Sequence, residues 1–284
     1  MNKKISQKIA FGVLRGTAAI VVMILLIILG FIFYKGFGVI SLDFLFSYPE
    51  EGMTSGGIWP AIVGTIYLTL GSIIVAFPLG VLSAIYLNEY AKASSWGVRI
   101  IRLMTNNLAG VPSVVFGIFG MTLFVNKLGF GDSIIAGSLT LALLVLPIVI
   151  STTEEALKQI DDSYRQASLS LGASKMKTIF RVVLPMSLPN VITGLILAIG
   201  RVSGETAPIL FTCAAYFLPH LPHSIMEQCM ALPYHLYVLA TSGTNMEASQ
   251  DMAYGTALVL VFIVLILNLI ANAIRSYFNN KIKR

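Results

Sequence analysis

The chain contains six runs of about 20 apolar residues, the length that an α-helix needs to cross the hydrocarbon core of a bilayer. Apolar residues make up 56% of the 284 and charged residues only 11%, whereas a soluble domain carries about 25% charged residues. The sequence therefore predicts an all-α, multi-pass membrane protein with six transmembrane helices. The six runs are approximately Gly16–Tyr34, Ala61–Leu87, Leu108–Val125, Ile134–Ile150, Leu188–Phe211 and Met252–Ile274.

The basic residues indicate how these runs are oriented. If the amino terminus is cytoplasmic, most of the 19 lysines and arginines fall in segments on the cytoplasmic side, and the outer stretch 213–251 contains none. By the positive-inside rule, both termini are then cytoplasmic. The net charge of +6 is thus a consequence of topology and not a sign of nucleic-acid binding.

The chain divides into three parts. Residues 1–60 form a cytoplasmic segment, a first transmembrane helix and a polar outer loop. Residues 61–274 form a five-helix unit with a cytoplasmic elbow at about 154–185, and 275–284 form a basic cytoplasmic tail. The first run is expected to stay in the mature protein, because it is longer than the apolar part of a signal peptide and no small-residue cleavage site follows it. Ser94–Thr105 has the pattern of an interfacial amphipathic helix.

Arg201 and Glu205 lie inside the fifth apolar run, four residues apart. Arg201 is about twelve residues past Pro189, which places it roughly 18 Å into a core about 30 Å thick. A charge at that depth is costly and marks a functional site by default. The guanidinium matches a tetrahedral oxyanion in bidentate fashion, and Glu205 can neutralise it when no anion is bound. The alternative is a buried structural pair that fixes helix register.

Gly200 and Gly204 are spaced so that another helix can approach closely on the same helix as Arg201. This contact can be internal to the chain or made with a partner subunit, and the sequence leaves both open.

The inner loop at about 154–185 predicts a helix–Gly–helix elbow in the cytoplasm. Asp161 to Ser163 supply helix-starting side chains, Gly172 suits the left-handed position that ends a helix, and Ser174 can cap a second helix over Lys175–Val183. A short exposed helix of this kind suits helix-in-groove recognition by another protein. The alternative, a plain solvated connector, is less consistent with the apolar residues Leu169, Leu171, Met176, Ile179 and Phe180.

The long outer loop carries the remaining reactive side chains. Cys213 and Cys229 can form a disulfide in an oxidising compartment, although two free thiols are the favoured reading because a helix bundle needs no such link. His220, His223 and His235 have neither a suitable spacing nor thiolate or carboxylate partners for zinc, so no metal site is expected.

The elbow carries a family resemblance. Gln166-Ala167-Ser168-Leu169-Ser170-Leu171-Gly172-Ala173-Ser174, followed by Val183-Leu184-Pro185, resembles the "EAA" loop of ABC importer permeases, with Gln166 in place of the usual Glu. The resemblance implies a type I importer permease fold and an elbow that docks on a cytoplasmic ATPase. It assigns the docking role to Tyr164, Gln166, Ala167, Leu169, Gly172 and Ala173.

More specifically, the chain resembles PstA-type permeases of phosphate-specific ABC importers. The matching segments are 58–65, 107–113, 154–157, 201–208 and 253–257, of which Arg201-Val-Ser-Gly-Glu205-Thr-Ala-Pro208 is the most specific. The resemblance implies a PstC-like second permease, a PstB-like ATPase dimer and a PstS-like phosphate-binding protein, in a bacterial or archaeal cytoplasmic membrane. A permease for another oxyanion, such as sulfate, is the runner-up.

Two other classes of protein are less consistent with the sequence. The chain lacks a Gly-x-x-x-x-Gly-Lys-[Ser/Thr] loop, so ATP and magnesium would be used by the partner and no cofactor by this chain. An intramembrane enzyme would need a nucleophile–base or metal-ligand set, and neither a His-Glu-x-x-His nor a Gly-x-Ser-x-Gly motif occurs. A secondary transporter would not require the elbow.

Overall fold

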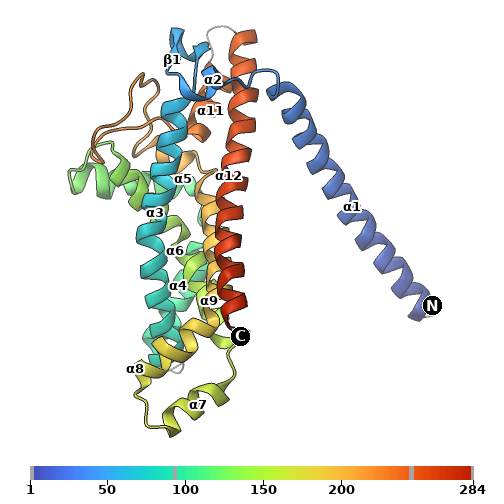
Figure 1. Ribbon diagram of the computed structural model, residues 1–284, viewed down its shortest axis with the longest axis vertical. Coiled ribbons are helices and arrows are strands. Elements are labelled where there is room, and N and C mark those ends of the chain that lie inside the picture. Colours follow the sequence, from blue (N-terminus) through green and yellow to red (C-terminus); the bar gives the residue numbers. More distant parts are fainter. Residues whose placement is uncertain (1–2, 92–94, 243–245, 283–284) are drawn as a thin grey trace.

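The structure, a computed structural model, describes residues 3–91, 95–242 and 246–282, and its regular elements are almost all helices (Figure 1). The first half contains α1 (Lys3–Gly36), α2 (Leu42–Phe46), η1 (Glu51–Met53), α3 (Trp59–Ile85), η2 (Tyr86–Tyr90), α4 (Trp96–Leu108), α5 (Ser113–Gly120) and η3 (Met121–Lys127). The second half contains α6 (Ile134–Lys158), α7 (Asp162–Ser170), α8 (Lys175–Thr178), η4 (Ile179–Val183), α9 (Leu184–Val202), α10 (Ala207–Leu210), α11 (Leu232–Ser242) and α12 (Met246–Ile282). A two-stranded antiparallel ribbon, β1 (Pro49–Glu50) and β2 (Ser55–Gly56), pairs Pro49 with Gly56.

Within the described residues, five helical segments are long and apolar enough to cross a membrane. They are Ala10–Gly36, Trp59–Tyr90, Ile134–Lys158, Lys175–Val202 and Ser249–Asn280. The multi-pass, all-α class is therefore confirmed, whereas the expected count of six spans is not.

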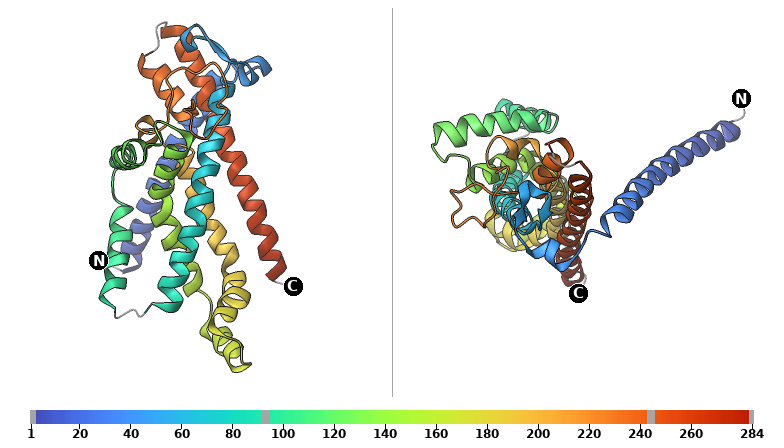
Figure 2. Two further views of the ribbon diagram at one scale, coloured as in Figure 1. Left: turned by 90° about the vertical axis from the view of Figure 1, so that its left-hand side faces the viewer. Right: turned by 90° about the horizontal axis from the view of Figure 1, so that it is seen from above.

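The third expected span, Leu108–Val125, was wrong as a single helix. α4 ends at Leu108, the chain turns, and α5 begins only after Pro112. Proline lacks the backbone N–H that would continue α4, and it restricts the residue before it. The apolar segment Ser113–Lys127 that follows is short and lies across the direction of α3 and α6 (Figures 1 and 2).

The fifth expected span, Leu188–Phe211, was also wrong in its end point. α9 stops at Val202, the backbone from Ser203 to Thr206 is not helical, and a short α10 follows. Pro208 cannot donate to the carbonyl of Gly204, and its ring would clash with that carbonyl in a continuous helix. Arg201 therefore lies in the last turn of α9.

The centre of the bundle is the packing of α3 against α6. Glycines let the two backbones approach closely: a Cβ at Gly80 would lie 2.8 Å from the Cβ of Val149, and one at Gly71 would lie 3.0 Å from the Cβ of Ser138. A cluster of buried apolar side chains surrounds this contact, including Leu68, Leu141, Leu144, Val145 and, from α9, Ala198 and Val202. Small residues at helix contacts are typical of membrane proteins, where close packing replaces the hydrophobic driving force.

The first helix stands apart from the bundle. α1 diverges from the bundle and touches α12 only near the carboxyl end of α1 (Figure 1). There Gly36 lies against the backbone of Tyr254, and the ring of Phe31 meets the ring of Tyr254 edge-on, with 5.6 Å between the ring centres. Most of its apolar side chains are exposed in the single chain. A helix this apolar needs lipid or another subunit around it.

The end of the bundle opposite the elbow is closed by α2, the β1–β2 ribbon, the loop after α10 and α11 (Figure 1). Cys213 and Cys229 lie buried in this outer cap as free thiols, with their sulfur atoms 3.4 Å apart. The hydrogen bond to Cys213, together with burial, raises the pKa of the Cys229 thiol well above its usual value. His235, on α11, is 1% exposed in the same cap.

At the other end, the chain forms the elbow predicted from the sequence. The Asp161 carboxylate accepts a hydrogen bond from the backbone N–H of Ser163 at 2.8 Å, which lowers the pKa of Asp161. Gly172 has φ +81°, and the Ser174 hydroxyl accepts from the N–H of Lys177 at 3.3 Å. α8 then continues through η4 into α9, and the elbow projects from the bundle (Figure 1).

The α3–α6 contact predicts the effect of a larger residue at position 80. A valine there would collide with Val149, so Gly80→Val should lower the stability of the purified protein by about 1–3 kcal/mol. Thermal unfolding in detergent measures this. Gly30→Val, on α1 where a Cβ would meet nothing within 4 Å, is the matched control. Equal melting temperatures for the two variants would contradict the described packing.

His235 predicts a loss of stability in acid. Burial lowers its pKa from 6.5 to about 4, and neither ring nitrogen has a hydrogen-bond partner among the described residues. The unfolded state therefore binds a proton that the folded state excludes. Stability should fall as the pH drops from 6.5 towards about 4, by up to about 3 kcal/mol. Unfolding followed across this pH range should show a weaker acid dependence in His235→Leu, and an unchanged dependence would disprove this assignment.

Candidate functional site

The Arg201 side chain lies at the carboxyl end of α9, at the break in the fifth apolar segment. A cation is favourable there because the last carbonyls of a helix carry partial negative charge. Its Nε is 3.5 Å from Oε1 of Glu205, which follows in the non-helical turn. The expected pair is thus present, but it bridges a helix end and does not lie along one continuous helix.

This pair is loose compared with a strong ion pair. Charge-assisted N–H···O bonds are about 2.7–2.9 Å long, and the buried Nε of Arg201 makes no hydrogen bond with the described residues. The Arg201 side chain is 35% exposed and that of Glu205 16%. The guanidinium therefore reaches the surface of the single chain with donors left to bind an anion.

Hydroxyl groups border the same turn. Glu205 and Ser203 line a cavity of about 10 Å³ together with Thr65 and Thr69 of α3. The hydroxyl of Thr69 is buried and has no hydrogen-bond partner among the described residues, whereas Thr65 accepts from the N–H of Leu232 at 2.8 Å. A cavity of this size holds at most about one water molecule, so it is too small for phosphate.

The sequence analysis did not single out Thr65 and Thr69. Their spacing of four residues places both on one face of α3, which is a signal that the sequence contains. Nothing in the sequence, however, indicated which helix that face would meet.

The two glycines near Arg201 do not pack tightly within the chain. A Cβ at Gly200 would meet only Nδ2 of Asn268, at 3.8 Å, and one at Gly204 would meet nothing within 4 Å. Gly204 also lies after the end of α9. Within the described residues these glycines make no close contact between helices, so contact with a partner subunit stays a prediction.

The residues expected to form the docking elbow lie together on α7 and the turn that follows it. Tyr164, Gln166, Ala167, Leu169 and Gly172 are exposed and Ala173 is half-buried. Leu171, at the apex, is 89% exposed, and Met176 on α8 is exposed as well. On the cytoplasmic side predicted from the sequence, these exposed apolar side chains favour a protein interaction site.

The inner side of the elbow is fixed to the bundle. The hydroxyls of Ser168 and Thr178 are 2.9 Å apart and join its two arms. Ile179 and Val183 of η4 are buried against Ile85 and Leu157, at the ends of α3 and α6. The elbow is thus packed against the bundle and is not a solvated connector.

Two ion pairs near the inner end were not anticipated. Arg102 of α4 donates to Glu154 of α6 at 2.9 Å, and Arg165 of α7 donates to Glu89 of η2 at 2.8 Å. The members of each pair are far apart in the sequence, so no local pattern indicated them.

Comparison with solved structures identifies the fold. The chain superimposes on a bacterial ABC transporter involved in the import of the acidic polysaccharide alginate with a TM-score of 0.62 and 16% identity, covering 96% of this chain and 99% of that one. It superimposes on the inward-facing MetNI methionine ABC transporter with a TM-score of 0.58 and 17% identity, covering 78% and 94%. The fold is that of a type I ABC importer permease.

Comparison of sequences identifies the family. The model of the "binding-protein-dependent transport system inner membrane component" matches residues 76–284. The probable ABC transporter permease YqgI of Bacillus subtilis is 34% identical over 95% of each chain. The phosphate transport permease PstA of Mycobacterium leprae is 39% identical, covering 80% of this chain and 72% of its own, and PstA of Yersinia pestis is 36% identical, covering 80% and 75%.

The chain belongs to the family of binding-protein-dependent transport system inner membrane components, and within it to the PstA-type permeases. It is a multi-pass integral membrane protein and a transporter subunit rather than an enzyme. Permeases of this family work together with an ATPase and a further permease.

Proposed function

We propose that this chain is one of two permease subunits of an ATP-driven importer of inorganic phosphate. The observation that carries the proposal is the Arg201 guanidinium, which reaches the chain surface at a helix end beside the Glu205 carboxylate. The names of the PstA relatives support phosphate as the anion. A PstC-like permease completes the pathway, a PstB-like ATPase dimer uses ATP and magnesium, and a PstS-like binding protein delivers phosphate. The complex belongs in a bacterial or archaeal cytoplasmic membrane.

The proposed passage is an exchange of partners at Arg201. When no anion is present, Glu205 neutralises the guanidinium across 3.5 Å. An arriving phosphate offers two oxygens to the planar fork and forms shorter, stronger bonds than Glu205 does. The nearby carboxylate repels the bound anion, which keeps the site from becoming a trap. Release follows when the two permease subunits change their relative position.

The small size of the cavity beside Glu205 supports a route along the surface of this chain. With a volume of about 10 Å³, this cavity is too small to hold phosphate. The exposed part of Arg201 instead lies on the outer surface of this chain. A second permease packed against that surface would enclose the route.

Phosphate uptake tests the role of Arg201. Arg201→Gln removes the charge and the fork, and should reduce the uptake of labelled phosphate by about tenfold to about a hundredfold, the effect of one or two lost charged hydrogen bonds. Uptake is measured in vesicles that contain the whole complex at wild-type abundance. Arg275→Gln, at an exposed arginine of α12, is the control and should transport normally.

Normal phosphate uptake by Arg201→Gln would refute the proposed site. Labelled sulfate serves as the second substrate in the same vesicles, and uptake of sulfate in preference to phosphate would assign the permease to the other oxyanion.

Assembly with the ATPase tests the docking role of the elbow. Leu171→Asp places a charge at the 89%-exposed apex, where it disturbs nothing inside the chain but should prevent burial in an ATPase cleft. Less than about a tenth of the normal ATPase should then copurify with the tagged permease, an effect of about 1.4 kcal/mol or more. Leu171→Met is the conservative control, and undiminished copurification of Leu171→Asp would rule out docking at this apex.

A further inference from the structure

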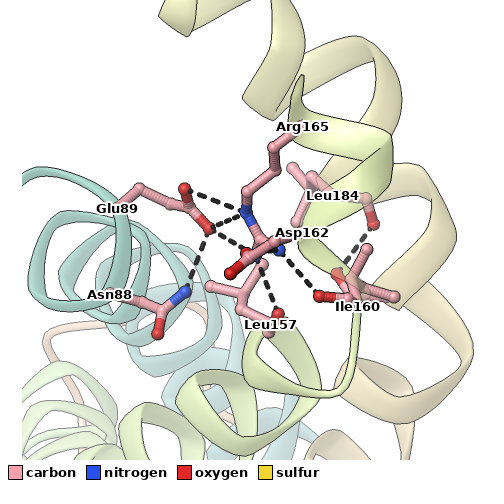
Figure 3. A network of polar contacts seen from close by, with 8 residues as sticks. Asn88, Glu89, Leu157, Ile160, Asp162, Arg165 and Leu184 are labelled. Atoms are coloured by element: carbon pink, nitrogen blue, oxygen red, sulfur yellow. Dashed lines mark hydrogen bonds and ion pairs between the residues drawn. The ribbon is translucent and has the colours of Figure 1, made fainter. Parts of the chain in front are cut away.

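One arginine of the elbow is bonded to the inner end of α3. Figure 3 shows Arg165, on α7, facing Glu89 in η2, the π-helical continuation of α3. The Arg165 guanidinium donates to the Glu89 carboxylate through Nη2 at 2.8 Å and through Nε at 3.2 Å. The two side chains are only 16% and 7% exposed. Both donors converge on Oε1, and Nε also lies 3.4 Å from Oε2. The 2.8 Å bond has the length of a charge-assisted hydrogen bond.

The same arginine also binds the inner end of α6. Its Nη2 donates to the carbonyl of Leu157 at 2.9 Å, and its Nη1 donates to the carbonyl of Ile160 at 2.7 Å and to Asp162 at 3.1 Å. Arg165 therefore joins α7 both to α3 and to the carboxyl end of α6. Directional hydrogen bonds of this kind hold α7 in register with α3 and α6, whereas apolar contacts alone would let the helices shift along one another.

The second arm of the elbow holds the same end of α3. The Lys175 ammonium, at the start of α8, lies 5.0 Å from the centre of the Tyr90 ring, within the range of a cation–π interaction. Tyr90 is the residue after Glu89. The two arms of the elbow, α7 and α8, are linked by the Ser168–Thr178 hydrogen bond. They thus contact two consecutive residues of η2, Glu89 and Tyr90.

α3 connects these contacts with the elbow to the candidate anion site. Glu89 lies at its inner end, and Thr65 and Thr69, towards its outer end, border the cavity beside Glu205. A displacement of η2 along the helix axis would therefore move the two threonines that line this cavity together with Glu205.

We propose that the Arg165–Glu89 pair makes α3 follow the elbow when the ATPase moves it. Arg165 and Glu89 are positioning residues: they touch neither phosphate nor ATP, and they convert elbow movement into movement of the transport helices. This inference rests on the proposed function, because it takes the elbow to be the ATPase contact. It predicts that losing the pair uncouples ATP hydrolysis from transport.

The test measures phosphate imported per ATP hydrolysed in proteoliposomes that contain the whole complex and its binding protein. Glu89→Gln keeps the side-chain size and removes the charge, and should lower this ratio about tenfold, within the range of coupling effects between sites. Glu89→Asp should recover part of it. Asp162→Asn is the matched control, because Asp162 bonds the same arginine but is exposed on α7 itself, and its ratio should equal that of the wild type.

The double variant Glu89→Gln/Arg165→Gln shows whether the two residues act as one unit. Its ratio should be no lower than that of Arg165→Gln alone, because partners in one contact are not additive. A wild-type ratio in Glu89→Gln, or independent losses in the two single variants, would overturn the proposal.

A distance measurement makes the test independent of the transported anion. Spin labels at Ser170, on the elbow, and at Leu82, an exposed residue of α3, should keep a constant separation with and without ATP in the wild type. In Glu89→Gln the separation should change with ATP. A wild-type complex that imports no phosphate would refute the proposed function alone, whereas an ATP-independent separation in Glu89→Gln would refute the coupling role.

Discussion

The close contact between α3 and α6 is the constraint on which the other features depend. In a bilayer, helices do not gain from burying apolar surface against one another, so their association relies on tight packing of small residues. Gly71 and Gly80 of α3 provide this fit against Ser138 and Val149 of α6. Both functional regions are attached to this pair of helices. The proposed anion site borders the outer part of α3, and the elbow packs against the inner ends of both helices.

The break after α9 explains how an arginine can be tolerated in this apolar segment. A guanidinium in the middle of a continuous apolar helix would be costly to bury. At the end of α9 it lies beside the last carbonyls of the helix, and a carboxylate follows within 3.5 Å. The same break leaves the pair loose, since Glu205 is in a turn and not in helical register. A loosely held, partly exposed guanidinium is suited to exchanging one anionic partner for another.

Much of this arrangement could be predicted from the sequence, because the responsible signals are local. Asp161, Gly172 and Ser174 determine where the elbow helices begin and end, and the structure contains those ends. Hydropathy was a weaker guide to geometry, since the segment after Pro112 is as apolar as a span but too short and lies crosswise. The Arg165–Glu89 pair could not be predicted, because it joins residues 76 positions apart whose meeting depends on the fold. No local sequence pattern predicts the partner subunit or the surface that would lie against Arg201.

The most direct measurement is a structure of the complete importer, embedded in lipid and trapped with phosphate during ATP hydrolysis. The account predicts an anion held by the Arg201 side chain at the boundary with the second permease, with Glu205 displaced from its partner. Phosphate located elsewhere, with Arg201 turned to acyl chains or sealed against protein in every state, would contradict it.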